Sequence, residues 1–181
     1  MKTYELHVAG LKRHLPIIQI KENLSIASFV LLGDIEMVDA AATALAEKLP
    51  DVDLLITAEA KGIPLVYELS KRMKLPRYVV ARKSLKSYML EPLIHEVKSI
   101  TTEEKQILCL DFHDVAFLKY KRIAIIDDVI STGASIKVLE ELVTKAGGRV
   151  VAKAAIIAEG DATKRDDIIF LGELPLFPHH Q

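Results

Sequence analysis

Apolar residues in this chain recur at two different spacings, and each spacing predicts a different kind of element. Three segments place apolar side chains three or four positions apart, which puts them on one face of a helix: 35–49, 65–73 and 136–146. Asp34 precedes the first segment as an N-cap, and Gly147 follows the last, where helices commonly end. The pattern therefore predicts three amphipathic helices.

Short unbroken apolar runs mark the predicted strands. The clearest are 53–58, 78–81 and 123–126, and the weaker ones are 28–32, 94–100 and 106–110. Pro16 argues against a regular central strand near the N-terminus, because proline cannot donate a ladder hydrogen bond. Strands and helices alternate with short connections and without a repeat, so we expect one domain over residues 1–181. Its predicted fold is α/β, a doubly wound, mostly parallel sheet with helices on both faces.

Composition narrows the classes of function open to this domain. The 181 residues carry 24 basic and 25 acidic side chains, a net charge of −1, so we do not expect bulk electrostatic binding to nucleic acid. Cys109 is the single cysteine, which excludes an internal disulfide and suits a reducing compartment. No secretory leader follows Met1, and the apolar runs are too short to span a bilayer. We therefore expect a cytoplasmic protein that binds neither membranes nor nucleic acid.

One stretch combines a strand, an acidic pair, a loop and a helix in the order that a phosphate site requires. Asp127 and Asp128 come where the strand over 123–126 should end, and a loop of small residues follows: Ser131, Thr132, Gly133, Ala134 and Ser135. N–H groups at a helix start lack partners and attract an anion, and the loop hydroxyls can donate further hydrogen bonds. A Cβ at Gly133 would push into that anion or twist the loop. The carboxylates would repel phosphate but suit vicinal ribose hydroxyls, so the stretch predicts a ribose 5-phosphate site.

The segment Ile125–Ser135 resembles the phosphoribosyl pyrophosphate (PRPP) motif of the type I phosphoribosyltransferases, with the apolar run, both acids and the Thr-Gly loop in register. An ordinary strand-to-helix turn is the alternative, but it would not require the two acids. The resemblance implies an enzyme that joins a nitrogen of a base to C1 of PRPP, forming a nucleoside monophosphate and releasing pyrophosphate. It also implies a homodimer, and Mg²⁺ as a cofactor that Asp127 and Asp128 would reach through water rather than directly.

Two further segments take their roles from the same resemblance. A turn after the first clear strand resembles the family's pyrophosphate-binding loop, although alone it would be an ordinary turn: Glu59, Ala60, Lys61 and Gly62. Residues 82–110 correspond to the family's flexible loop, which closes over bound PRPP; the alternative is a solvated basic hairpin. Within this loop lie the cations that we expect near pyrophosphate, in the same or in a neighbouring subunit: Arg82, Lys83 and Lys86.

The base is less well determined by the sequence. The layout resembles the adenine and xanthine phosphoribosyltransferases of purine salvage more than the hypoxanthine-guanine type. Residues 99–102 lack the loop glutamate usual in adenine enzymes and look xanthine-like, whereas residues 159–161, Glu-Gly-Asp, replace the Lys-Ser-Phe pattern of xanthine enzymes. We therefore expect adenine first and xanthine a close second. A hood segment over residues 1–26 should cap the base pocket, with Leu11–Ile18 as its candidate lining.

Two other functions remain open from the sequence. Some purine repressors use a domain of this kind to sense PRPP without catalysis, but they add an N-terminal DNA-binding module. The residues before the first predicted helix leave no room for that module, so a stand-alone enzyme is favoured. An orotate-type pyrimidine enzyme lacks support in the loop residues but is not excluded.

Overall fold

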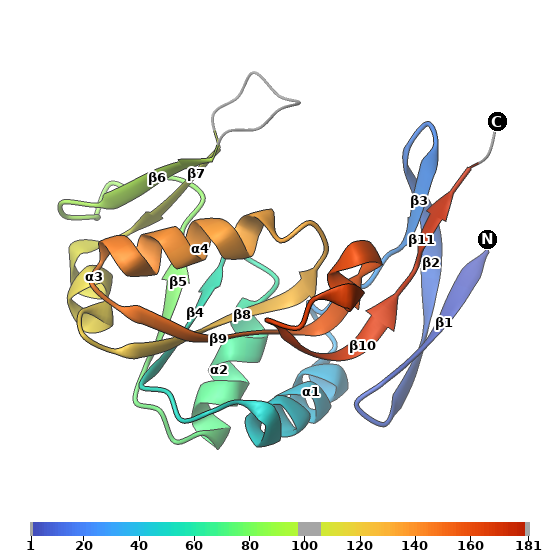
Figure 1. Cartoon of the computed structure of the whole chain (residues 1–181), viewed down its shortest axis with the longest axis horizontal. Coiled ribbons are helices and arrows are strands. Elements are labelled where there is room, and N and C mark those ends of the chain that lie inside the picture. Colours follow the sequence, from blue (N-terminus) through green and yellow to red (C-terminus); the bar gives the residue numbers. More distant parts are fainter. Residues whose placement is uncertain (1, 98–105, 180–181) are drawn as a thin grey trace.

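A five-stranded parallel sheet forms the centre of the computed structural model, which describes residues 2–97 and 106–179. Its strand order is β10-β9-β8-β4-β5, and all neighbouring pairs are parallel (Figure 1). The strands are β4 (Leu54–Ala58), β5 (Tyr78–Ala81), β8 (Arg122–Ile130), β9 (Arg149–Glu159) and β10 (Ile169–Leu174). Several of them are nearly continuous apolar runs, because a parallel sheet is buried on both faces. The predicted α/β sheet is confirmed.

Helices cover both faces of this sheet, as expected. α1 (Ile35–Lys48) and α2 (Ile63–Arg72) pack on one face, and α4 (Ala134–Lys145) packs on the other (Figure 1). The predicted N-cap of α1 is present, because the Asp34 carboxylate accepts a hydrogen bond from the Met37 N–H at 3.0 Å. A short helix, α3 (Phe112–Leu118), leads into β8 and is not apparent from the apolar spacing. Among the described residues, no helix is long and apolar enough to cross a membrane.

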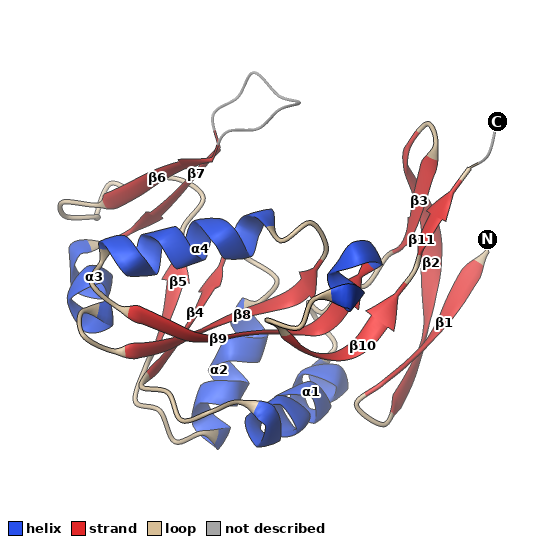
Figure 2. Cartoon of the chain, in the orientation of Figure 1, coloured by secondary structure: helices blue, strands red, loops and turns tan. Residues whose placement is uncertain are grey.

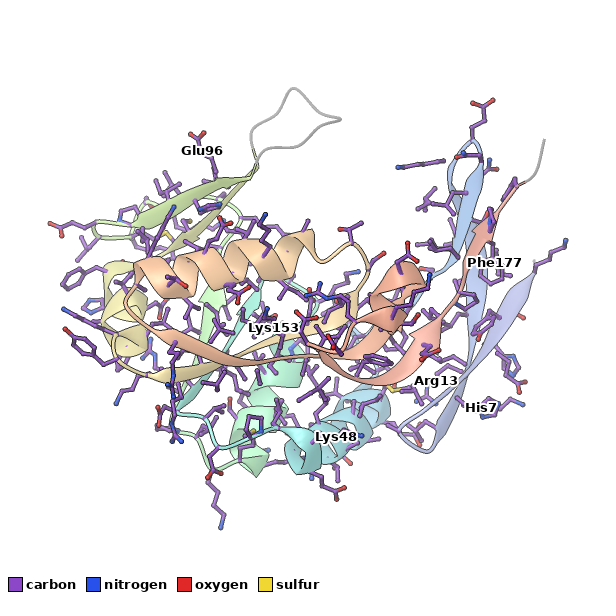
Figure 3. The ribbon with its side chains drawn as sticks, in the orientation of Figure 1. His7, Arg13, Lys48, Glu96, Lys153 and Phe177 are labelled. Atoms are coloured by element: carbon purple, nitrogen blue, oxygen red, sulfur yellow. The ribbon has the colours of Figure 1, made fainter. Side chains whose placement is uncertain are left out.

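A separate four-stranded antiparallel sheet brings both ends of the chain together beside β10 (Figure 2). It is formed by β1 (Thr3–Val8), β2 (Leu11–Lys21), β3 (Leu24–Ala27) and β11 (Leu176–Pro178), in that order. The two outer strands, β1 and β11, are also in aromatic contact, since the rings of Tyr4 and Phe177 meet edge to face at 5.9 Å. Phe177 lies on β11 (Figure 3). The segment expected to act as a hood is therefore completed by residues from the C-terminus.

The expectation that Pro16 prevents a regular strand is wrong, and the pairing of β2 explains why. β1 pairs with β2 only as far as Pro16, whereas β3 pairs with it from Ile17 onward. The proline lies where the strand changes partners, and its carbonyl still accepts a hydrogen bond from the Ser28 N–H at 2.9 Å. Its missing N–H therefore removes little from either ladder.

A two-stranded hairpin leaves the central sheet after β5 and rests on α4. It consists of β6 (Leu93–Val97) and β7 (Gln106–Leu110); the predicted second strand is confirmed, and the first begins one residue earlier than predicted. His95 connects the hairpin to α4, with its Nε2 2.8 Å from Glu141 and its Nδ1 2.9 Å from the Lys145 ammonium. Glu96, on the same strand, points away from α4 (Figure 3). Residues 98–105 lie outside the described part of the chain.

Two other strand predictions need correction. Residues 28–32 are not a strand: Phe29 and Leu31 are buried and Val30 is exposed, which gives the expected alternation, but no described strand pairs with them. β8 does not end at residue 126 but continues to Ile130, because its pairing with β9 extends four residues beyond Ile126 while its pairing with β4 stops at Ile125. The acidic pair consequently lies inside a strand whose β4-facing edge is open.

Candidate functional site

The carboxyl ends of β4, β8 and β9 surround one cleft, at the edge where open α/β sheets bind ligands. The cleft has a volume of about 360 Å³. Its polar lining comes mainly from these strand ends and includes Glu59, Lys61, Asp127, Asp128, Ser131, Ser135 and Glu159. Lys83 also reaches it from beyond β5, and Ile26–Val30 and Leu174 supply an apolar wall. Most residues proposed from the sequence for PRPP therefore line a single cavity.

The acidic pair lines this cleft, with Asp128 buried and Asp127 partly buried. Asp128 is 3% exposed, and its Oδ2 has no hydrogen-bond partner among the described residues. The Lys61 ammonium lies 3.6 Å from that oxygen, which is too far for a hydrogen bond but close enough for an ion pair. Asp127 accepts a hydrogen bond from the Asp128 N–H at 2.8 Å. Burial raises the pKa of Asp127 to about 7, and the neighbouring Asp128 carboxyl adds to the effect.

The small-residue loop encloses a second, smaller cavity of about 120 Å³ against the start of α4. Gly133 is the N-cap of α4 and has a left-handed backbone with φ of +79°. The Ala134 N–H points to the Thr132 hydroxyl oxygen at 3.4 Å, and no side chain caps the helix start. The remaining N–H groups of this first turn are therefore available to an anion, as the sequence predicted.

Arg165 lies directly behind this loop, a neighbour for which the sequence holds no signal. A Cβ built on Gly133 would come within 2.4 Å of Arg165 Nη1. Two hydrogen bonds to Asp167, at 2.8 and 2.7 Å, hold the guanidinium in place. Lys153, beneath α4, also lies 3.5 Å from Asp167 (Figure 3). The side-chain direction at Gly133 thus meets Arg165, so a Cβ would strain the loop, which is one of the two effects expected from the sequence.

The turn after β4 binds the loop that follows β5, and not all of its polar groups face the cleft. The Glu59 carboxylate binds the Arg82 guanidinium and accepts a hydrogen bond from the Lys83 N–H at 2.8 Å. Burial opposes the charge on Glu59, but these hydrogen bonds outweigh it and hold its pKa below the ordinary value. The Glu59–Ala60 peptide is cis. Gly62 begins α2 so close to Thr57 that a Cβ there would lie 2.2 Å from the Thr57 hydroxyl.

The cations expected near pyrophosphate are therefore in different positions. Lys61 and Lys83 line the cleft. Arg82 is outside the lining, bound to Glu59 and donating to the Tyr88 hydroxyl at 2.9 Å. Lys86 is also outside it and donates to the Ser84 hydroxyl at 2.6 Å. In this structure only part of the predicted cationic set faces the cleft.

The candidate residues for the base pocket do not line this cleft. Leu11–Ile18 lies in β2, which β3 separates from β11 in the antiparallel sheet, and no residue of it lines the cleft. The cleft is lined instead by Ile26–Val30, so that of the hood segment only Ile26 contributes. Residues 99–102, used to compare adenine and xanthine enzymes, lie outside the described part of the chain.

Comparison with known proteins agrees with this geometry. Residues 32–173 match the family model of the phosphoribosyl transferase domain. An adenine phosphoribosyltransferase of Thermosipho africanus is 34% identical, over 75% of this chain and 78% of that protein. A hypoxanthine/guanine phosphoribosyltransferase of Methanococcus voltae is also 34% identical, but the match covers 64% of this chain and only 57% of the relative.

Solved structures show the same fold. The crystal structure of adenine phosphoribosyltransferase from Thermoanaerobacter pseudethanolicus has a TM-score of 0.71 at 24% identity, over 89% of this chain and 94% of the other. The Trypanosoma brucei adenine enzyme, solved with AMP, pyrophosphate and ribose-5-phosphate, has a TM-score of 0.58 at 17% identity, over 75% and 62%. The two relatives at 34% identity are enzymes by name and give no support to the PRPP-sensing alternative. The resemblance seen in Ile125–Ser135 is therefore confirmed: this chain belongs to the phosphoribosyl transferase family.

Proposed function

We propose that this protein transfers the 5-phosphoribosyl group of PRPP to a purine base, with adenine as the first candidate and xanthine the second. The products are a nucleoside monophosphate and pyrophosphate, as in purine salvage. One observation carries the proposal: an open helix start, an acidic pair and two lysines meet at the carboxyl ends of adjacent strands. Each part matches one part of PRPP, namely the 5-phosphate, the ribose hydroxyls and the diphosphate.

The residues divide the work of binding among them. Backbone N–H groups and hydroxyls of 131–135 would hold the 5-phosphate at the start of α4. Asp127 and Asp128 would accept hydrogen bonds from the 2- and 3-hydroxyls of the ribose. Lys61 and Lys83 would face the diphosphate, whose negative charge increases as it leaves. The base would then lie toward the apolar wall formed by Ile26–Val30 and Leu174.

The chemistry needs little covalent help from the protein. A nitrogen of the base forms a bond to C1 while the bond from C1 to the pyrophosphate oxygen breaks, and the base releases its N–H proton. The transition state resembles an oxocarbenium ion, as in glycoside hydrolysis. Holding both reactants in line and stabilising the departing charge are therefore the main contributions of the cleft.

The acidic pair fits Mg²⁺ as the cofactor. Asp128 Oδ2 is a buried acceptor without a hydrogen bond, and Mg²⁺ prefers oxygen ligands while keeping several waters. Among the described residues, no group of three or more acidic, histidine or cysteine side chains is placed to hold a metal ion, and Asp127 and Asp128 would meet a hydrated ion held mainly by the substrate. When bound, the ion would neutralise charge on the diphosphate.

We also propose that the protein works in the cytoplasm as a homodimer. Exposed apolar side chains support an interface: Ile35 on α1 is 83% exposed, and Tyr67 on α2 is 54% exposed. Sedimentation of the purified protein would check this, and a monomer at micromolar concentration would contradict it.

The experiment that tests the function is a panel of bases assayed for PRPP-dependent pyrophosphate release. Adenine, xanthine, hypoxanthine, guanine and orotate are each incubated with protein, PRPP and Mg²⁺. We expect release with a purine and none with orotate. The variant in which Asp127 and Asp128 are both Asn serves as the control for contaminating activity. A protein that binds PRPP but releases pyrophosphate with no base would be a sensor and not an enzyme.

A further inference from the structure

Glu159 is a buried carboxylate that the binding of PRPP does not use. It ends β9 and is followed by the 3-10 turn Gly160–Lys164. The side chain lines the same cleft as the acidic pair, although the residue is only 8% exposed. Within the described part of the chain its carboxylate has no hydrogen-bond or ion-pair partner. Its oxygens are not among the fully enclosed atoms without a partner, so they face the open cleft, where a bound molecule that donates a hydrogen bond can reach them.

The strand order places Glu159 on the side of the cleft away from the lysines. β9 lies between β8 and β10, whereas Lys61 and Lys83 follow β4 and β5, on the other side of β8. Lys61 is moreover already close to Asp128, at 3.6 Å. The diphosphate, which needs cations, therefore belongs on the β4 side. A group that donates hydrogen bonds belongs on the β9 side.

The other lining on that side is apolar and suits a flat heterocycle. Leu174 is the last residue of β10, the strand next to β9. Ile26 and Ala27 belong to β3, which pairs with β11, the strand that follows β10 in the chain. Phe29, 7% exposed, lies in the connection that follows. The faces of a ring bound here would pack against these apolar side chains. Its polar edge would then lie toward Glu159, which can recognise it by a hydrogen bond.

We infer that Glu159 accepts a hydrogen bond from an exocyclic amino group of the base and thereby selects amino-purines over oxo-purines. The inference rests on the proposed phosphoribosyl transfer and specifies its substrate class. An ionised carboxylate can only accept, and an amino group donates, so the two pair well. An oxo group in the same place would set one acceptor against another and leave Glu159 buried and unpaired. Under the proposed function the preferred base is adenine, and the rejected analogue is hypoxanthine.

Glu159→Gln is the sharpest test, because it keeps the size of the side chain but supplies both an acceptor and a donor. The amide can accept from an amino group or donate to an oxo group, so it should no longer discriminate. We expect the ratio of kcat/KM for adenine to that for hypoxanthine to fall by about 10- to 100-fold, the range for a hydrogen bond to a charged group. Affinity for PRPP should be little changed, since the lysines assigned to its diphosphate lie on the other side of β8.

Asp161→Asn is the matched control. Its carboxylate lies two residues further along and is 93% exposed, paired only with Lys164 at 2.8 Å. It loses the same charge from the same turn without touching the cleft, so the ratio of the two bases should stay at the wild-type value. A general effect of charge would change both variants alike and would contradict the inference.

Guanine and xanthine form a second pair, differing by an amino or oxo group at C2. A change in this ratio alone would still support the carboxylate–amino contact, but would make guanine the preferred base instead of adenine. If Glu159→Gln leaves both ratios at wild-type values, or weakens PRPP binding measured by calorimetry, the inference is wrong and the residue has a structural role. If wild-type protein releases pyrophosphate with no base, the proposed function fails first and this inference with it.

Discussion

Gly133 offers the most direct test of the phosphate cradle. Its φ of +79° lies in the left-handed region, where a residue with a Cβ is strained by about 1–2 kcal/mol. The same Cβ would lie 2.4 Å from Arg165 Nη1. That contact is the less costly of the two, because it meets the end of a long side chain whose ion pair with Asp167 is partly exposed and worth about 0–1 kcal/mol. We therefore expect Gly133→Ala to cost about 1–3 kcal/mol, with the backbone as the main cause.

The strain at position 133 should weaken the binding of phosphate ligands as well as lower the stability of the protein. A loop that relaxes away from positive φ must return to it when its N–H groups surround a phosphate. Gly133→Ala should thus weaken AMP and PRPP by about 5- to 150-fold, at 1.4 kcal/mol for each factor of ten. Gly133→Val, with a branched side chain, should abolish both. Free pyrophosphate, assigned to the Lys61 side of the cleft, should bind nearly as in the wild type.

Calorimetric titration of AMP, PRPP and pyrophosphate measures these effects. Gly10→Ala is the matched control: Gly10 has a φ of +75° in the β1–β2 turn, and nothing lies within 4 Å of an added Cβ. It should lose similar stability in urea and keep wild-type affinity for all three ligands. Adding Arg165→Ala to Gly133→Ala removes the contact with the guanidinium but not the backbone strain. We therefore expect Gly133→Ala to weaken AMP binding as much in the Arg165→Ala background as in the wild type. AMP binding at wild-type affinity in Gly133→Ala would place the phosphate elsewhere.

Three further predictions concern the acidic pair and the hairpin. Burial raises the pKa of Asp127 to about 7 from an ordinary 3.8, so its contribution to stability is fully present below pH 3.8 and is lost as the pH rises through 7. Urea unfolding at pH 5 and pH 8 should show this loss of stability in the wild type and not in Asp127→Asn. Equal losses in the two proteins would contradict the prediction. Replacing Asp127 and Asp128 together by Asn should leave the fold intact but lower kcat/KM for PRPP, at about 1.5–3 kcal/mol for each lost hydrogen bond to a charged group; unchanged kinetics would refute the ribose assignment. Residues 82–110 should exchange amide hydrogens more slowly with a PRPP analogue and Mg²⁺ bound, and equal exchange would leave a plain hairpin anchored through Arg82 and Cys109, whose backbones pair at 2.8 and 2.9 Å.

Local patterns in the sequence determined the three long helices, three of the five central strands and the small-residue loop before α4. The spacing of Ile136, Leu139 and Val143 predicted the buried face of α4, because a helix turns every 3.6 residues whatever surrounds it. Asp34 as the N-cap of α1 and the small-residue loop at the start of α4 follow from the bonding of a single turn. A motif with this much local chemistry also indicates its family, so the class of function follows from the residues of that one stretch.

The tertiary structure decided everything that depends on which segments become neighbours. Pro16 is tolerated because β2 changes partners there, and residues 28–32 alternate like a strand but find none to pair with among the described strands. Arg165 reaches Gly133 from 32 positions along the chain, and Glu159 faces the cleft only because β9 lies beside β8. Apolar spacing records whether a side chain is buried but not what it is buried against. The loop proposed to hold the phosphate was therefore predicted by the sequence, whereas the apolar wall of the cleft was set by the packing of distant strands.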